Sequence, residues 1–295
     1  MKRLLFTILI VVVSEVGART NAPPAGWSPF FRGGSTYNFD AGLDGGGEFS
    51  LHRYYAEGGM AYLFRRDRMV SFSAGYGQDD YHFDGVAAEP WNNIENIRAG
   101  IFCRWAFDNE WTSFMAGSVR AFGETGVQMS DALTGAIFGG ASYRFSDRLS
   151  LGPGLGVVGQ LDDQPLVFPI IVVDWNITEK LSLSTGGGLA ATAGPGLSLS
   201  YKMTKHWNVG LVGRYENKRF RLAGDSVAPD GVGEDRNIPV LGTLSYVLYP
   251  GTEISGLLGM NLNGRLRAED KNGAVLYSSE YGNSVTAGLT AKIRF

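Results

Sequence analysis

The chain has 295 residues, a formal net charge of −3, 42 glycines and 12% aromatic residues. This near balance of charge gives no support for a nucleic-acid partner, because proteins that bind nucleic acids carry a basic excess. The high content of large apolar residues excludes a disordered chain.

The N-terminus, MKRLLFTILIVVVSEVGA, has the three parts of a secretory signal peptide. They are a basic pair at 2–3, an apolar run at 4–13 and a small-residue cleavage site at 16–18. A membrane anchor is the alternative, but the apolar run is well short of the ~20 residues that a spanning helix needs. We therefore expect a signal peptide over residues 1–18, removed on export.

A periplasmic lead-in is expected over residues 19–29, which hold Pro23, Pro24 and Pro29. The rest of the chain, residues 30–295, is expected to form one domain. Its single cysteine, Cys103, excludes an intramolecular disulfide.

A turn flanked by alternating apolar and polar residues recurs along the chain. SYRFSDRLSL (142–151) is its clearest copy, and the others are AYLFRRDRMV (61–70), CRWAFDNEWT (103–112), DWNITEKLSL (174–183), SYKMTKHWNV (200–209) and SYVLYPGTEI (245–254). Each predicts a β-hairpin. Longer connections separate the hairpins, and transmembrane barrels show this alternation of short periplasmic turns and longer extracellular loops.

The segments between the turns have a period of two. In the last of them, Val285, Ala287, Leu289, Ala291 and Ile293 share one face, whereas polar and basic residues share the other. An aromatic residue also stands just before each tight turn: Tyr62, Trp105, Tyr143, Trp175, Tyr201 and Tyr246. A soluble sandwich does not need this placement, but a barrel that meets a membrane interface does.

The strands of the hairpins and the final strand together make an odd number of strands, whereas bacterial single-chain barrels have an even number. FFRGGSTYNFDAGL (30–43) is the candidate for the missing strand. We therefore predict an all-β, antiparallel, up-and-down transmembrane β-barrel of about fourteen strands. About twelve remain the alternative if the glycine-rich segments 181–190 and 194–203 are misread.

The chain ends on Phe295, in phase with the apolar face of its last segment. In this it resembles outer-membrane β-barrel proteins of Gram-negative bacteria, specifically uncharacterised porin-like barrels. Tyrosine is common two residues before the end in that family, whereas this chain has Ile293. The resemblance implies location in the outer membrane, contact with its lipid and lipopolysaccharide, and reading of the Phe295 strand by the barrel-assembly machinery.

Basic residues dominate the face expected to line the lumen. The pore-lining candidates are Arg53, Arg98, Arg104, Arg144, Arg214, Arg265, Lys292 and Arg294, against the acidic Glu57 and Asp174. Rings of Arg or Lys favour anions in a pore. Our first hypothesis is therefore a passive channel, not an enzyme, for small solutes, with anions as the finer expectation. The alternative is that these side chains pair with acidic neighbours and fill a narrow lumen.

Two other functions stay open. His52 and His82 are expected near each other at the long-loop rim with Ser50, Asp79 and Asp80. Because such residues can form a nucleophile and its base, a second hypothesis is a hydrolase of lipid or lipopolysaccharide at this rim. A structural or adhesive barrel would use loops 221–236 and 268–280 as its contact surface.

No cofactor or metal is expected. Gly154, Gly156 and Gly159 have GxGxxG spacing, but LDDQP follows, which cannot open the helix that a dinucleotide site requires. The acidic loop residues lack EF-hand spacing.

Overall fold

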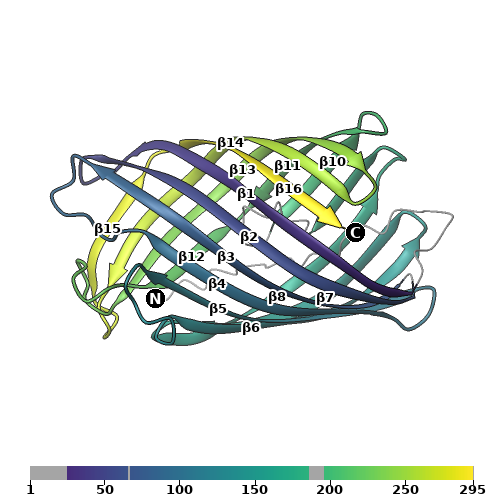
Figure 1. Cartoon of the computed structure of the whole chain (residues 1–295), viewed down its shortest axis with the longest axis horizontal. Coiled ribbons are helices and arrows are strands. Elements are labelled where there is room, and N and C mark those ends of the chain that lie inside the picture. The colour runs from purple at the N-terminus through teal and green to yellow at the C-terminus, as the bar shows by residue number, and fades with distance from the viewer. Residues whose placement is uncertain (1–24, 66, 186–195, 295) are drawn as a thin grey trace.

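The computed structural model describes residues 25–65, 67–185 and 196–294, and it shows an elongated barrel of tilted strands (Figure 1). None of these residues forms a helix long and apolar enough to span a bilayer. The strands are β1 (Gly26–Gly42), β2 (Glu48–Arg65), β3 (Arg68–Asp84), β4 (Ile94–Ala106), β5 (Trp111–Glu124), β6 (Leu133–Ser146), β7 (Leu149–Gln160), β8 (Asp163–Asn176), β9 (Leu181–Thr185), β10 (Gly196–Lys202), β11 (Trp207–Arg214), β12 (Glu216–Arg221), β13 (Val232–Tyr249), β14 (Thr252–Glu269), β15 (Val275–Tyr281) and β16 (Ser284–Arg294).

Neighbours in sequence pair antiparallel, and β1 pairs with β16 to close the ring. β11 and β12 both pair with β13, while β15 and β16 both pair with β14, so each of these couples is one interrupted strand. The result is a closed, up-and-down, 14-strand barrel, as predicted. The twelve-strand alternative is wrong, because the described parts of both doubtful segments, β9 and β10, pair in the wall.

Some expected boundaries differ. β1 begins at Gly26, inside the expected lead-in. Pro29 lies in this strand opposite Met60 of β2. The expected loops 221–236 and 268–280 are shorter, since β13 starts at Val232 and β15 at Val275. The expected signal peptide and Phe295 lie outside the described residues.

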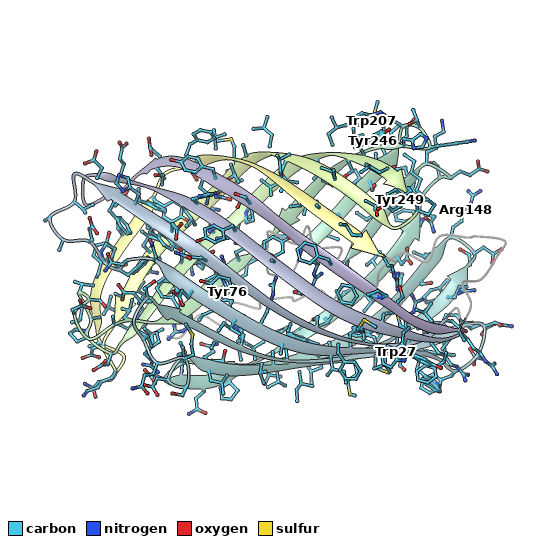
Figure 2. The ribbon with its side chains drawn as sticks, viewed as in Figure 1. Trp27, Tyr76, Arg148, Trp207, Tyr246 and Tyr249 are labelled. Carbon is cyan, nitrogen blue, oxygen red and sulfur yellow. The ribbon has the colours of Figure 1, made fainter. Side chains whose placement is uncertain are left out.

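The period-two pattern separates an outer from an inner face. On β4, Ile97 and Ile101 point outward and are exposed, whereas Phe102 packs inside against a buried apolar cluster on β5 and β8. Aromatic side chains pair on the outer face beside the tight turns. The ring centroids of Trp27 and Tyr62 are 5.0 Å apart, and those of Trp207 and Tyr246 are 4.8 Å apart. Figure 2 places Trp27, Trp207 and Tyr246 toward the same end of the barrel.

The barrel narrows at its long-loop end. β12 leaves the course of β11 and, besides β13, meets β5, where Arg221 pairs in parallel with Gly123. On the other side, β15 meets the end of β1 through a bridge between Leu43 and Tyr281. β1–β5 and β12–β15 therefore close a second, smaller ring at this end.

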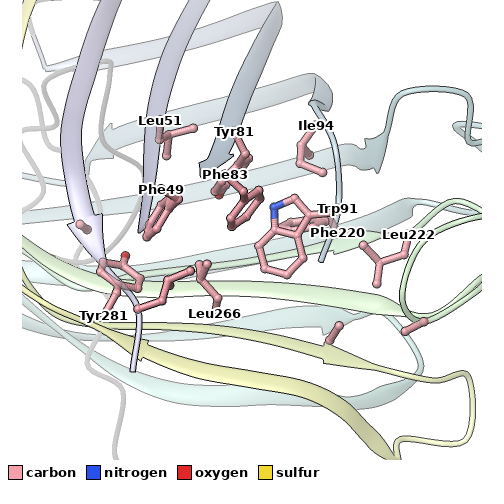
Figure 3. Packing of buried hydrophobic residues seen from close by; sticks show 14 residues of the cluster. Phe49, Leu51, Tyr81, Phe83, Trp91, Ile94, Phe220, Leu222, Leu266 and Tyr281 are labelled. Carbon is pink, nitrogen blue, oxygen red and sulfur yellow. The ribbon is translucent and has the colours of Figure 1, made fainter. Parts of the chain in front are cut away.

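An apolar core fills this smaller ring (Figure 3). Trp91 is 1% exposed and stands edge-on to Tyr81 and Phe220, with ring centroids 5.6 Å and 5.0 Å away. Phe49, Leu51, Phe83, Leu222, Leu266 and Tyr281 complete the packing. Each such side chain contributes roughly 1.5–3 kcal/mol when fully buried. The lumen is thus packed with apolar side chains at the long-loop end.

One irregularity changes which residues face inward. Asn263 of β14 has a φ of 52°, and the register against β13 shifts between Arg236 and Ile238. An extra residue in one strand reverses the alternation beyond it. On the short-turn side of the bulge, the odd-numbered Leu257 is buried and faces inward. On the long-loop side, the even-numbered Leu266 faces inward instead.

Candidate functional site

A buried ionic network ties opposite walls of the barrel together below the apolar core. Arg53 of β2 donates to Asp79 Oδ1 of β3 at 3.1 Å and to Glu216 Oε2 of β12 at 3.1 Å. Lys218 Nζ of β12 donates to Asp79 Oδ2 at 2.5 Å. Because β12 supplies two of the four partners, these bonds hold it across the lumen against β2 and β3.

Asp235 of β13 extends the network. Its two carboxylate oxygens accept hydrogen bonds from Tyr81 at 2.8 Å and from Tyr281 at 2.9 Å. Both tyrosines belong to the apolar core, so the polar network and the core form one continuous closure.

A second cluster lies farther toward the short-turn end. Glu57 is buried and accepts two hydrogen bonds from Arg32, at 3.0 Å from Nε and 2.6 Å from Nη2. Arg98 Nε lies 2.9 Å from its other carboxylate oxygen, and the Arg98 guanidinium sits 5.4 Å above the ring of Tyr55. One buried carboxylate therefore balances two arginines on the inner wall.

Most of the pore-lining candidates lie on the inner face. Arg53 and Arg98 belong to the two clusters above. Arg104 and Arg144 line a small cavity of about 20 Å³ together with Glu110 and Asp174. Arg214 is buried at the end of β11, while Lys292 and Arg294 share the inward alternation of Thr286 and Thr290 on β16.

Arg265 is the exception, and its expected position is corrected by the structure. It lies beyond the Asn263 bulge, donates to Ser278 Oγ at 3.2 Å in an exposed pair, and alternates with the core residue Leu266. The simple period-two count that put Arg265 in the lumen fails because the bulge moves it to the outer face.

Sequence reasoning missed the role of Glu216 and Lys218. The stretch ENKRFR (216–221) has charges on both faces, a pattern that by itself predicts only where a lipid-crossing segment ends. In the structure one face meets β2 and β3, and the other contacts the β7–β8 turn, where Arg221 forms an ion pair with Asp162. Arg221 holds the pKa of the exposed Asp162 below its ordinary value by this hydrogen bond. Charges on both faces were the available sign of a strand with no lipid-facing side.

The rim histidines both point outward. His52 is opposite Asp80 in the β2–β3 register and His82 is opposite Ser50. Ser35 of β1 forms a hydrogen bond of 2.7 Å with His52 Nε2. The glycine-rich segment 152–159 is part of strand β7, and a Cβ on Gly156 would lie 2.4 Å from the Phe168 ring, so glycine is needed there for packing.

The closed ring of antiparallel strands and its apolar outer face define the class of protein, an up-and-down β-barrel of the transmembrane type. Residues 86–289 match the family model described as "Domain of unknown function (DUF6268)", and the chain belongs to that family. A comparison with curated protein sequences gives no match.

Solved structures of similar proteins include a FadL homologue from Pseudomonas aeruginosa, with a TM-score of 0.50 and 10% identity over 91% of this chain and 90% of that chain. An outer-membrane channel from Pseudomonas putida F1 has a TM-score of 0.44 and 11% identity over 95% of this chain and 100% of that chain. The Pseudomonas putida toluene transporter TodX gives 0.46 and 11% over 92% and 90%. At such identity, the likeness to the FadL homologue concerns the fold alone.

Proposed function

We propose that the protein is a passive outer-membrane channel for small solutes, with a closure at its long-loop end. The observation that carries the proposal is the closed barrel with an inner face of charged and hydroxyl side chains, including Ser255, Thr286 and Thr290. A polar inner wall is what a pathway for dissolved solutes requires.

The way in which β12 is attached supports an opening movement of the closure. β12 is a short strand joined to β11 through Tyr215, which belongs to neither strand. Besides the apolar contact of Phe220, it is held to the opposite wall by buried ion pairs, through Glu216 and Lys218. Such pairs give little net stability over apolar packing because desolvation offsets their attraction. They therefore suit a contact that must break when the pathway opens.

The preference for anions is the finer part of the proposal. Arg53 and Arg98 face Asp79, Glu216 and Glu57, so their charges are largely balanced. The basic side chains that remain as selectivity candidates lie nearer the short-turn mouth: Arg104, Arg144, Lys292 and Arg294. Because Glu110 and Asp174 stand beside the first two, we propose only a weak anion preference.

Outer-membrane location, export through a signal peptide over 1–18, and contact with lipid and lipopolysaccharide belong to the same proposal. So does recognition of the Phe295 strand by the barrel-assembly machinery. The exposed apolar outer face, with residues such as Leu258 and Leu289, supports contact with lipid.

Single-channel recording in a planar bilayer tests the proposal, using the signal-less protein refolded to a heat-modifiable barrel. We expect discrete conductance steps and, under a salt gradient, a small anion-directed reversal potential that shrinks in Lys292→Gln and Arg294→Gln. The matched control is Arg265→Gln, which removes the same charge on the outer face and should leave the reversal potential unchanged. A folded barrel that never conducts would refute the channel.

A further inference from the structure

A serine, a histidine and an aspartate lie side by side on the outer face of three adjacent strands. Ser35 of β1 is 2.7 Å from His52 Nε2 of β2, and His52 is paired in register with Asp80 of β3. Directly opposed residues in a sheet have Cβ atoms about 4.5–5.5 Å apart, which brings the Asp80 carboxylate within reach of the imidazole. Asp80 Oδ1 is buried and accepts no hydrogen bond within the described part of the chain.

The depth of this group on the barrel corresponds to the outer membrane interface. The aromatic residues that stand just before the tight turns form one girdle, the short-turn girdle, and Tyr62 is one of them. His52 precedes Tyr62 by about ten residues, which is a rise of about 25 Å for a strand tilted by ~40°. That distance equals the height of the apolar band of an outer-membrane barrel. Tyr37 and Tyr54 contact the His52 ring, and Tyr76 lies on β3 with its hydroxyl bonded to Gln78, as expected for a second aromatic girdle. Ester linkages of membrane lipids lie at such an interface, between the acyl chains and the headgroups.

An apolar groove leads to the serine along the outer face. It has a volume of about 820 Å³, and Ser35 and Tyr37 stand at its edge while Leu244, Leu258, Ala287 and Leu289 line it. The groove exists because Gly242 and Gly256 lie between larger leucines on neighbouring strands. Its size and lining suit one or two acyl chains.

We propose that Ser35, His52 and Asp80 form the active site of a serine hydrolase that cleaves fatty acyl esters of outer-leaflet lipids. This activity is independent of the lumen and goes beyond the proposed channel. A hydroxyl bonded to imidazole is the arrangement that activates a serine nucleophile.

The reaction has two steps, acylation of Ser35 and hydrolysis of the acyl ester. Ser35 Oγ attacks the ester carbonyl carbon as its proton passes to His52 Nε2. The bond to the lipid alcohol breaks, and His52 returns the proton to that alcohol, leaving an acyl ester on Ser35. A water molecule then loses a proton to His52 and attacks the acyl carbon. The bond between that carbon and Ser35 Oγ breaks, His52 gives its proton to Ser35 Oγ, and the fatty acid is released.

Asp80 is a positioning residue in this scheme. With Nε2 facing Ser35 as the base, the other ring nitrogen, Nδ1, carries a proton and can donate a hydrogen bond to the Asp80 carboxylate. Such contacts are often loose without substrate and tighten when it binds. The ring of Tyr37, 6.1 Å from His52, limits the imidazole from the other side.

The test measures fatty-acid release by the refolded full-length mature barrel in mixed micelles that contain either a diacyl phospholipid or lipid A. Release from one substrate only shows which of the two lipids is cleaved. Release from both shows that the site recognises the acyl ester linkage and not one particular lipid. We expect Ser35→Ala and His52→Gln to reduce release to the background rate. Ser278→Ala, which removes an exposed outer-face hydroxyl that is bonded to Arg265 and not to an imidazole, is the matched control and should keep the full rate.

Asp80→Asn should lower kcat about 10²-fold with KM unchanged, since only the transition-state interaction is lost. A merely structural role would alter KM and the folded fraction together. Independently of turnover, a fluorophosphonate probe should label Ser35, forming the oxygen–phosphorus bond with loss of fluoride, and should not label the His52→Gln variant. No release from either lipid by a heat-modifiable barrel, or full release by Ser35→Ala, would overturn the proposal.

Discussion

Replacing Met115 with arginine tests the assignment of the lipid-facing surface. Met115 points outward from β5, is 60% exposed, and follows the girdle residue Trp111 by about four residues. At ~3.3 Å per residue and a tilt of ~40°, it lies about 10 Å above the girdle, close to the middle of a band ~25 Å tall. Since an exposed side chain loses little packing, the cost is that of placing a charge in hydrocarbon. We expect Met115→Arg to lower the free energy of unfolding by about 2–4 kcal/mol.

The assay is urea unfolding of the barrel in phospholipid vesicles, followed by tryptophan fluorescence and by the heat-modifiable shift on gels. The control is Phe107→Arg, which introduces the same charge at a residue 64% exposed in the short turn beside Trp111. At this depth we expect a cost below about 1 kcal/mol. Equal small costs for both variants would mean that Met115 does not face lipid and that the two faces have been wrongly assigned.

Three further changes probe other parts of the structure. Asn263→Val should lower the free energy of unfolding by roughly 1–2 kcal/mol, because a β-branched side chain is strained at a φ of 52°, whereas Asn263→Gly should not; equal urea midpoints would contradict the bulge. Trp91→Ala should cost about 3–5 kcal/mol and raise the open probability in bilayer recordings by loosening the apolar core; an unchanged open probability would speak against the core as part of the closure. The Arg221–Asp162 ion pair lowers the pKa of Asp162, so its contribution is present above the unfolded-state pKa of about 3.9 and is lost as pH falls through the lower folded value; in acid titrations followed by unfolding, Asp162→Asn should remove this loss, and an unchanged pH profile would refute the pair's contribution.

The sequence pattern predicts much of this fold because a membrane barrel has two strict faces. Alternation in the strands and an aromatic residue before each tight turn are direct consequences of lipid on one side of the wall. The fourteenth strand followed from the requirement that the ring close with an even number, and β1 occupies the place assigned to it.

The long-loop end could not be predicted in this way, because there the same residues no longer face lipid. Phe49, Leu51 and Phe83 are apolar and alternate like lipid-facing residues, yet they pack inside the smaller ring. The tertiary contacts of β12 with β5 and of β15 with the end of β1 determine that this volume is a core.

The candidate site shows a similar division. The arginines of the inner wall were found by their phase. Glu216, which pairs with Arg53, and Lys218, which pairs with Asp79, come from a strand more than 130 residues away in sequence, and no local pattern specifies that pairing. The approach of Ser35 to His52 also depends on the β1–β2 register, which places Tyr37 opposite His52 and leaves Ser35 on the diagonal.

The most direct test of the proposed closure locks β12 in place. Gly123→Cys and Arg221→Cys, in a Cys103→Ser background, put two thiols on paired positions of neighbouring strands, whose separation of about 4.8 Å lies within disulfide range. Single-channel recording of the same protein should show conductance steps after reduction and none, or far fewer, after oxidation, with Cys103→Ser alone insensitive to redox state. Equal conductance in the oxidised and reduced states would contradict a pathway closed by β12.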